Sequence, residues 1–125
     1  MPVKTYLQTA ITQVQTAMAE MESQMHSIQQ NADNRKKQLQ SEIANMEKER
    51  GVHMTAIGQS QDTGQRAVLE QRLGSLNKQI DDHKAEISRI DSDLGRTQQR
   101  KDELHRNLYN AIGELTRLSA LPDIG

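Results

Sequence analysis

The sequence predicts an all-α fold: a long antiparallel two-helix coiled-coil hairpin over residues 1–125, which we expect to assemble into a four-helix bundle or a higher oligomer. Apolar residues recur at alternating steps of three and four through both halves of the chain, as in a coiled-coil seam. The two prolines, Pro2 and Pro122, lie outside both repeats. A polar segment bounded by glycines separates the halves near residue 61.

The first predicted helix covers about residues 3–57. Its seam positions up to residue 32 are Leu7, Ile11, Val14, Met18, Met21, Met25, Ile28 and Ala32. Arg35 and Leu39 take the next two places, and Ile43 follows, so that two steps of four come in succession. Such a stutter locally unwinds a supercoil. The sequence therefore predicts a local irregularity beginning at Arg35.

The segment GQSQDTG, residues 58–64, is predicted to reverse the chain. Gly58 can adopt the positive φ of a residue that caps the C-terminus of a helix. Asp62, with Gln65 three residues later, matches a capping box at the start of the next helix. Because a short connection makes consecutive helices antiparallel neighbours, we expect Leu7 to lie against the C-terminal third of the chain.

The second predicted helix covers about residues 65–120, and its heptads run without interruption. The seam positions are Leu69, Leu73, Leu76, Ile80, His83, Ile87, Ile90, Leu94, Thr97, Lys101, Leu104, Leu108, Ala111, Leu115 and Leu118. Pairing about residue 61 places Met21 near Lys101 and Met25 near Thr97.

Three residues that can carry a charge interrupt the two seams: Arg35, His83 and Lys101. Polar residues at seam positions of coiled coils specify the register, and long side chains can carry their charged end to the surface. We interpret these three residues as register-setting, with Arg35 near Ile87 and His83 near Leu39. The alternative is a polar site, or a weak point at which the helices open.

The composition excludes several classes of protein. Only 34% of the residues are hydrophobic and 2% aromatic, which is too little apolar surface for a thick globular core. A net charge of −1 argues against binding to nucleic acid or to a membrane surface. The chain has no cysteine, the N-terminal segment lacks the apolar region of a signal peptide, and no apolar run is long enough to cross a bilayer. We expect a cytoplasmic protein, with export by a signal-peptide-independent route as the open alternative.

The sequence predicts no catalytic, cofactor or metal site. None of the four histidines is paired with another at a spacing of four residues, and HExxH is absent. The phosphate-binding glycine motifs and the nucleophile elbow are absent as well. A two-helix hairpin also encloses no pocket for chemistry. We therefore expect a protein that is not an enzyme and that needs no cofactor.

Two groups of apolar residues are candidate interaction sites. They are Met18, Met21 and Met25 along the first seam, and Val52, Met54 and Ile57 near the turn. Flexible methionines can line a promiscuous binding groove, and apolar residues at an exposed end can mark a partner site. The alternatives are that the methionines fill the core and that the residues near the turn cover one another.

Residues 5–31 carry only two full charges, Glu20 and Glu22. Small apolar residues lie beside the seam: Val3 just before this segment, and Ala10 and Ala17 within it. Interface cores are depleted of charge, so this surface is an interface candidate. An exposed polar face is an equally good interpretation.

These features favour a non-enzymatic scaffold or adaptor that acts through self-association and through contacts with other proteins. The partners expected are further copies of the chain and, as a second option, another protein. One alternative is a chaperone-like clamp that holds client polypeptides with the methionines or with the turn region. Another is a secreted or filament-forming helical component.

Overall fold

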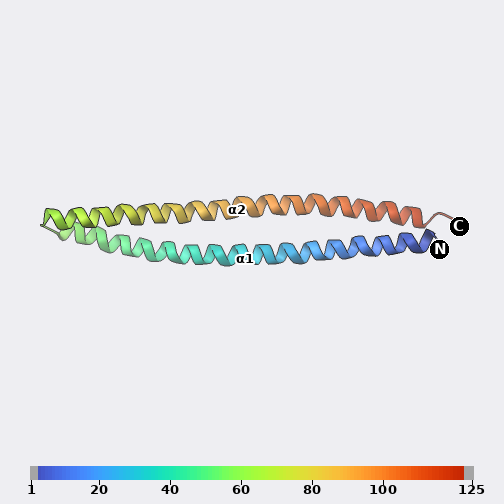
Figure 1. The fold of residues 1–125 in the computed structure, drawn as a ribbon, viewed down its shortest axis with the longest axis horizontal. Coiled ribbons are helices and arrows are strands. Elements are labelled where there is room, and N and C mark those ends of the chain that lie inside the picture. The colour runs from blue at the N-terminus through green and yellow to red at the C-terminus, as the bar shows by residue number, and fades with distance from the viewer. Residues whose placement is uncertain (1–2, 123–125) are drawn as a thin grey trace. The chain divides into compact units, whose positions relative to one another are not determined.

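The computed structural model describes residues 3–122, and two long helices account for nearly all of them. Helix α1 is Val3–Gln59 and helix α2 is Thr63–Ser119, each of 57 residues. The helices pack against each other in opposite directions (Figure 1). The described residues contain no strand. The predicted all-α helical hairpin is thus confirmed.

Residues 60–62 form the turn. The backbone N–H of Ser60 donates to the carbonyl of Ala56 at 3.0 Å, which completes the last turn of α1. Oδ1 of Asp62 accepts a hydrogen bond from the backbone N–H of Gly64 at 3.0 Å. This satisfies one of the amide groups that a helix start leaves without an intrahelical partner. Asp62 is therefore the N-cap of α2, as its position in the sequence predicts.

The prediction for Gly58 is wrong. Gly58 lies inside α1, and none of the described glycines has a positive φ. The physical reason is that α1 continues past Gly58. The backbone N–H of Ser60 donates to carbonyls of the last turn of α1, so no residue with a positive φ is needed to end the helix. The connection is consequently shorter than the predicted segment 58–64.

The structure forms two compact units. Unit 1 comprises Met1–Gln30 and Leu94–Gly125, and unit 2 comprises Asn31–Asp93. Within each unit a segment of α1 runs beside a segment of α2 in the opposite direction (Figure 1). Leu7 therefore shares a unit with the C-terminal third of the chain, as the antiparallel closure requires.

Unit 2 contains most of the fully buried apolar side chains of the described chain. Leu39 and Ile80 are 0% and 1% exposed, and Ile43 and Leu76 are also buried. The four residues occupy predicted seam positions on the two helices. A narrow contact between two helices can therefore exclude water where large aliphatic side chains meet at successive seam positions.

The seam of α1 in unit 2 includes Lys36 rather than Arg35. The side chain of Lys36 is 23% exposed, whereas that of Arg35 is 44% exposed. The inward positions are then Ala32, Lys36, Leu39 and Ile43, at steps of four, three and four. The stutter therefore begins at Ile28 and not at Arg35, because two successive steps of four lead from Ile28 to Lys36.

The seam of α2 shifts by one residue in unit 1. Leu104 is 54% exposed although the uninterrupted heptads place it in the seam, and Leu118 is exposed as well. The neighbouring residues His105 and Ser119 are half-buried instead. An α-helix drifts by about 20° per heptad from a strict seven-residue repeat. Over several heptads this drift moves the inward face to the next residue, which corrects the prediction of an unshifted seam.

Candidate interaction surface

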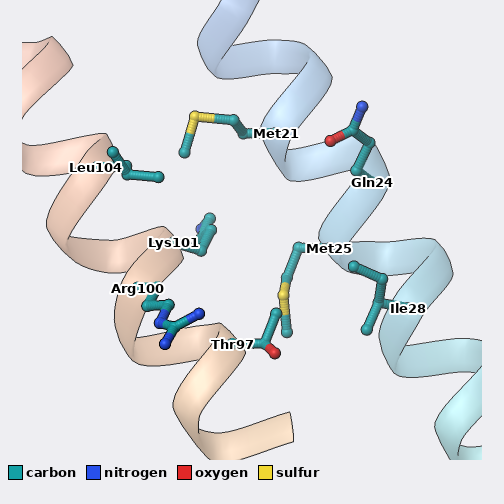
Figure 2. Close-up of a pocket in the computed structure, with 8 residues that line it drawn as sticks. All are labelled: Met21, Gln24, Met25, Ile28, Thr97, Arg100, Lys101 and Leu104. Carbon is teal, nitrogen blue, oxygen red and sulfur yellow. The ribbon is translucent and has the colours of Figure 1, made fainter. Parts of the chain in front are cut away.

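A groove runs between the helices on one side of unit 1, with a volume of about 190 Å³. Figure 2 shows its lining, which α1 and α2 supply in equal parts. The lining residues are Met21, Gln24, Met25, Ile28, Thr97, Arg100, Lys101 and Leu104. Both predicted cross-helix pairs, Met21 with Lys101 and Met25 with Thr97, thus line the same groove.

Helix geometry explains why these residues share one side. On each helix the four lining residues are spaced i, i+3, i+4 and i+7, which places them on a single face. The side chain of Met21 points toward Leu104, and Met25 lies beside Thr97 (Figure 2). Met25 is buried and forms the floor of the groove. Ile28, at 45% exposure, and Leu104 form apolar walls that water reaches.

Next to the groove, a cluster of charged side chains connects the two helices. Nζ of Lys101 on α2 pairs with a carboxylate oxygen of Glu22 on α1. Nε2 of His105 lies 3.7 Å from the same oxygen. The side chain of Lys101 is mostly buried, and its ammonium group is held by Glu22 and, at 3.9 Å, by Asp102. The polar residue predicted in the α2 seam is therefore paired across the helices.

In unit 2 the two residues predicted as polar seam positions, His83 and Arg35, also pair across the helices, although Arg35 lies outside the observed seam. Nε2 of His83 lies 2.7 Å from Oε2 of Glu42, and the pair is half-buried. Arg35 donates through Nε and Nη2 to Oε1 of Glu86, at 3.1 and 3.0 Å. These contacts connect α1 to α2 at defined positions, which is consistent with the register-setting interpretation.

Lys36 forms a further ion pair between the helices of unit 2. Nζ of Lys36 donates to Oδ1 of Asp91 at 2.8 Å, and Asp33 lies 3.8 Å away. The hydrogen bond that Lys36 donates to Asp91 raises the pKa of Lys36 above its ordinary value of 10.5, and the charges of Asp91 and Asp33 add to the increase. Partial desolvation of the ammonium group opposes this shift.

The predicted residues near the turn lie in unit 2 and are not brought together as one site. Val52 and Met54 are exposed, whereas Ile57 is half-buried. Val52 contributes to a shallow hollow on the surface of α1, and Met54 is not among the residues that line it. The hollow is lined by Lys48, Gly51, Val52, Thr55, Ala56 and Gln59. Val68 on α2 is a further exposed apolar residue that the prediction missed.

Met18 is half-buried and does not line the groove. Of the three methionines predicted as one interaction site, only Met21 and Met25 therefore lie together in the groove. Sequence reasoning missed the exposed walls, because it assigned Ile28 and Leu104 to the seam. A signal was present in the sequence: the C-terminal part of α2 has more apolar positions than one narrow seam uses. Leu104, Leu108, Ala111, Ile112, Leu115 and Leu118 all fall within fifteen residues.

Within residues 3–122, no three His, Asp or Glu side chains are grouped so that they could hold a metal ion. Neither helix contains, in its described residues, a stretch apolar enough over a sufficient length to cross a membrane. Comparison of the chain with protein-family models, with curated proteins and with solved structures gave no significant match.

Proposed function

We propose that the protein is a non-enzymatic coiled-coil scaffold or adaptor that acts through self-association in the cytoplasm. The observation that supports this most directly is the contrast between the two units. Unit 2 buries its best seam residues almost completely, whereas unit 1 leaves Ile28, Leu104 and Leu118 exposed. Large aliphatic side chains at repeated positions of one helix pair are typical of a surface that another protein covers.

The total accessible surface also favours association. It is 9221 Å², whereas a compact monomer of this mass would expose roughly 6,700 Å². The excess, about 2,500 Å², is larger than the roughly 1,200–2,000 Å² that a stable protein interface buries in total. Removal of apolar surface from water contributes about 25 cal/mol per Å². Association therefore offers this chain a source of stability that a single two-helix pair lacks.

A chaperone-like clamp is the second candidate function. The presence of Met21 and Met25 in an open groove favours it, because methionine adapts its shape to different apolar partners. A clamp would bind unfolded polypeptides through the groove or through Val52 and Met54. A scaffold would bind a folded copy of itself in a defined ratio.

Mass measured by sedimentation equilibrium over a wide concentration range tests the proposed function. We expect a defined oligomer that dissociates on dilution, with helical content that falls as it dissociates. A monomer at every concentration would contradict self-association. Titration with a chemically unfolded polypeptide separates the two candidates, since only the clamp predicts saturable binding that competes with the oligomer. Cell fractionation would check the cytoplasmic location.

A further inference from the structure

We infer that the groove side of unit 1 packs against the same side of a second copy, with α2 antiparallel to its counterpart and Asn107 at the two-fold axis. The groove of each copy then lies opposite the segment around Glu114 of the other copy. This inference rests on the proposed self-association and adds the surface, the orientation and the position of the axis. It follows from three features of unit 1: an apolar stripe on α2, a pair of opposite charges placed symmetrically about Asn107, and a row of uncharged residues on α1.

The apolar stripe is carried by Leu104, Ala111 and Leu118, which follow one another at steps of seven on α2. Residues seven apart are turned by only about 20° relative to each other, so the three lie on one face. Leu104 lines the groove, which places the stripe on the groove side. Leu108 and Leu115 are half-buried next to it.

Together with Ile112, which is half-buried four residues after Leu108, these residues form an apolar face wider than the two positions per heptad of one seam. Narrow seams with two apolar positions per heptad suit a two-stranded coiled coil, whereas helices in a bundle have a face at least about 100° wide. In unit 1 the inner part of this face contacts α1, and the outer part, Leu104 and Leu118, remains exposed. A second pair of helices would complete the core.

The charges beside the stripe are arranged symmetrically. Arg100, Asn107 and Glu114 are seven residues apart, all three are exposed, and Arg100 lines the groove. Arg100 and Glu114 have opposite charges and lie at equal distances from Asn107, about 10.5 Å along the helix axis. Within one copy Glu114 accepts a hydrogen bond from Arg117 at 2.5 Å, and this pair is exposed, so that Arg100 of a second copy would join or replace it. If two α2 helices pack antiparallel about Asn107, each Arg100 meets Glu114 of the other copy. A parallel pair would instead oppose Arg100 to Arg100, which is unfavourable.

One row of residues on the groove side of α1 is uncharged. Gln24 lines the groove, and Ala17, Ala10 and Val3 precede it at steps of seven. The three small side chains allow the α1 helices of two copies to approach closely. Glu20 lies beside this row, three residues after Ala17, and is exposed. A two-fold axis perpendicular to the helices places α1 beside α1 wherever it places α2 beside α2. Such an isologous interface closes as a dimer.

The second copy is the occupant that these observations favour, because Arg100 and Glu114 are complementary charges about Asn107 and the apolar face is partly exposed. The exposed area agrees, since the excess surface of one chain is enough to supply its half of a stable interface, about 800 Å². The exposed residues near the turn, Val52 and Met54, lack such a pairing of charges across a symmetry point.

Two pairs of full-chain variants test the inference. The first pair is Leu104→Glu and Val68→Glu, which add the same charge at residues of nearly equal exposure, 54% and 50%. We expect Leu104→Glu to weaken dimerisation by at least about a hundredfold, since each dimer would bury two unpaired carboxylates. Val68→Glu should dimerise like the unmodified chain. Circular dichroism at high concentration checks that both variants remain helical.

The second pair is Asn107→Cys and Asn110→Cys, which is feasible because the chain has no cysteine of its own. Both asparagines are exposed on α2, less than one helical turn apart along the chain. Under mild oxidation of the dimer, Asn107→Cys should form a disulfide between copies in most molecules, and Asn110→Cys should form little. The charge swap adds a check of orientation: Arg100→Glu should weaken the dimer, and adding Glu114→Arg should restore it.

The outcomes separate the inference from the function on which it rests. If the unmodified chain is a monomer at every concentration, both are wrong. If it is a dimer but Leu104→Glu leaves it intact, or Asn110→Cys cross-links as well as Asn107→Cys, self-association stands and the inferred surface or axis is wrong. A monomeric Leu104→Glu variant together with selective cross-linking at residue 107 would support the inference.

Discussion

Nε2 of His83 lies 2.7 Å from Oε2 of Glu42 on the opposite helix of unit 2. The contact is half-buried, and it lies on a seam that also contains the fully buried Leu39 and Ile80. A hydrogen bond at a half-buried seam position connects the two helices in one register, because a shift of one helix along the other by one turn would break it. Its contribution can be separated from that of ordinary surface ion pairs.

A double-mutant cycle with His83→Ala and Glu42→Ala should give a coupling free energy of about 0.5–1.5 kcal/mol in chemical denaturation. The matched control is the pair Lys84 and Glu47 in the same unit, whose charged atoms are 3.7 Å apart and whose side chains are exposed. That cycle should give less than about 0.5 kcal/mol. Equal couplings would show that the His83 contact has no special role.

Lys36 and Asp91 predict a dependence of stability on alkaline pH. The pKa of Lys36 is raised in the folded state, mainly by its hydrogen bond to Asp91. A raised folded-state pKa stabilises the fold fully below the ordinary value of 10.5, and the stabilisation is lost as pH rises through the folded-state pKa. The unfolding free energies of the unmodified chain and of Asp91→Asn should therefore differ at neutral pH and converge at strongly alkaline pH.

An NMR titration of the Lys36 side chain provides the direct readout. In Asp91→Asn the pKa of Lys36 should move down toward its ordinary value. An unchanged Lys36 titration would contradict the contact.

Leu39→Ala should be strongly destabilising, because Leu39 is fully buried between the helices of unit 2. Loss of a buried leucine side chain costs about 2–5 kcal/mol from lost burial and the cavity that remains. Val52→Ala is the control, since Val52 is exposed and its truncation should change the unfolding free energy by less than about 0.5 kcal/mol. Thermal and denaturant unfolding followed by circular dichroism would measure both, and a similar loss in the two variants would refute this core.

Gly58→Ala distinguishes a helical residue from a left-handed cap. In the structure Gly58 is helical, and an added Cβ would meet nothing within 4 Å. Alanine should then stabilise the protein by about 0.5–1 kcal/mol, the usual difference in helix propensity. Gly74→Ala in α2 is the matched control, also with nothing within 4 Å of its Cβ, and should give a similar gain. A loss of stability at Gly58 alone would indicate a positive φ there.

Several parts of the structure follow from the sequence alone. Apolar steps of three and four determine that both halves are helical, and the Asp62 cap determines where the second helix begins. The antiparallel pairing also follows, because a short connection leaves the helices no other neighbour. The antiparallel pairing places Met21 and Lys101 in the same groove, as predicted.

The tertiary structure decided which residues of each heptad face inward. Leu104 and His105 are adjacent in the sequence, and so are Arg35 and Lys36. The spacing of apolar residues could not determine which residue of each pair faces the other helix. The reason is geometric: a helix of 3.6 residues per turn and a repeat of 3.5 drift apart, so the inward residue depends on how far the two helices wind around each other. That winding is a property of both helices together, and it left Leu104 exposed on the groove side of unit 1.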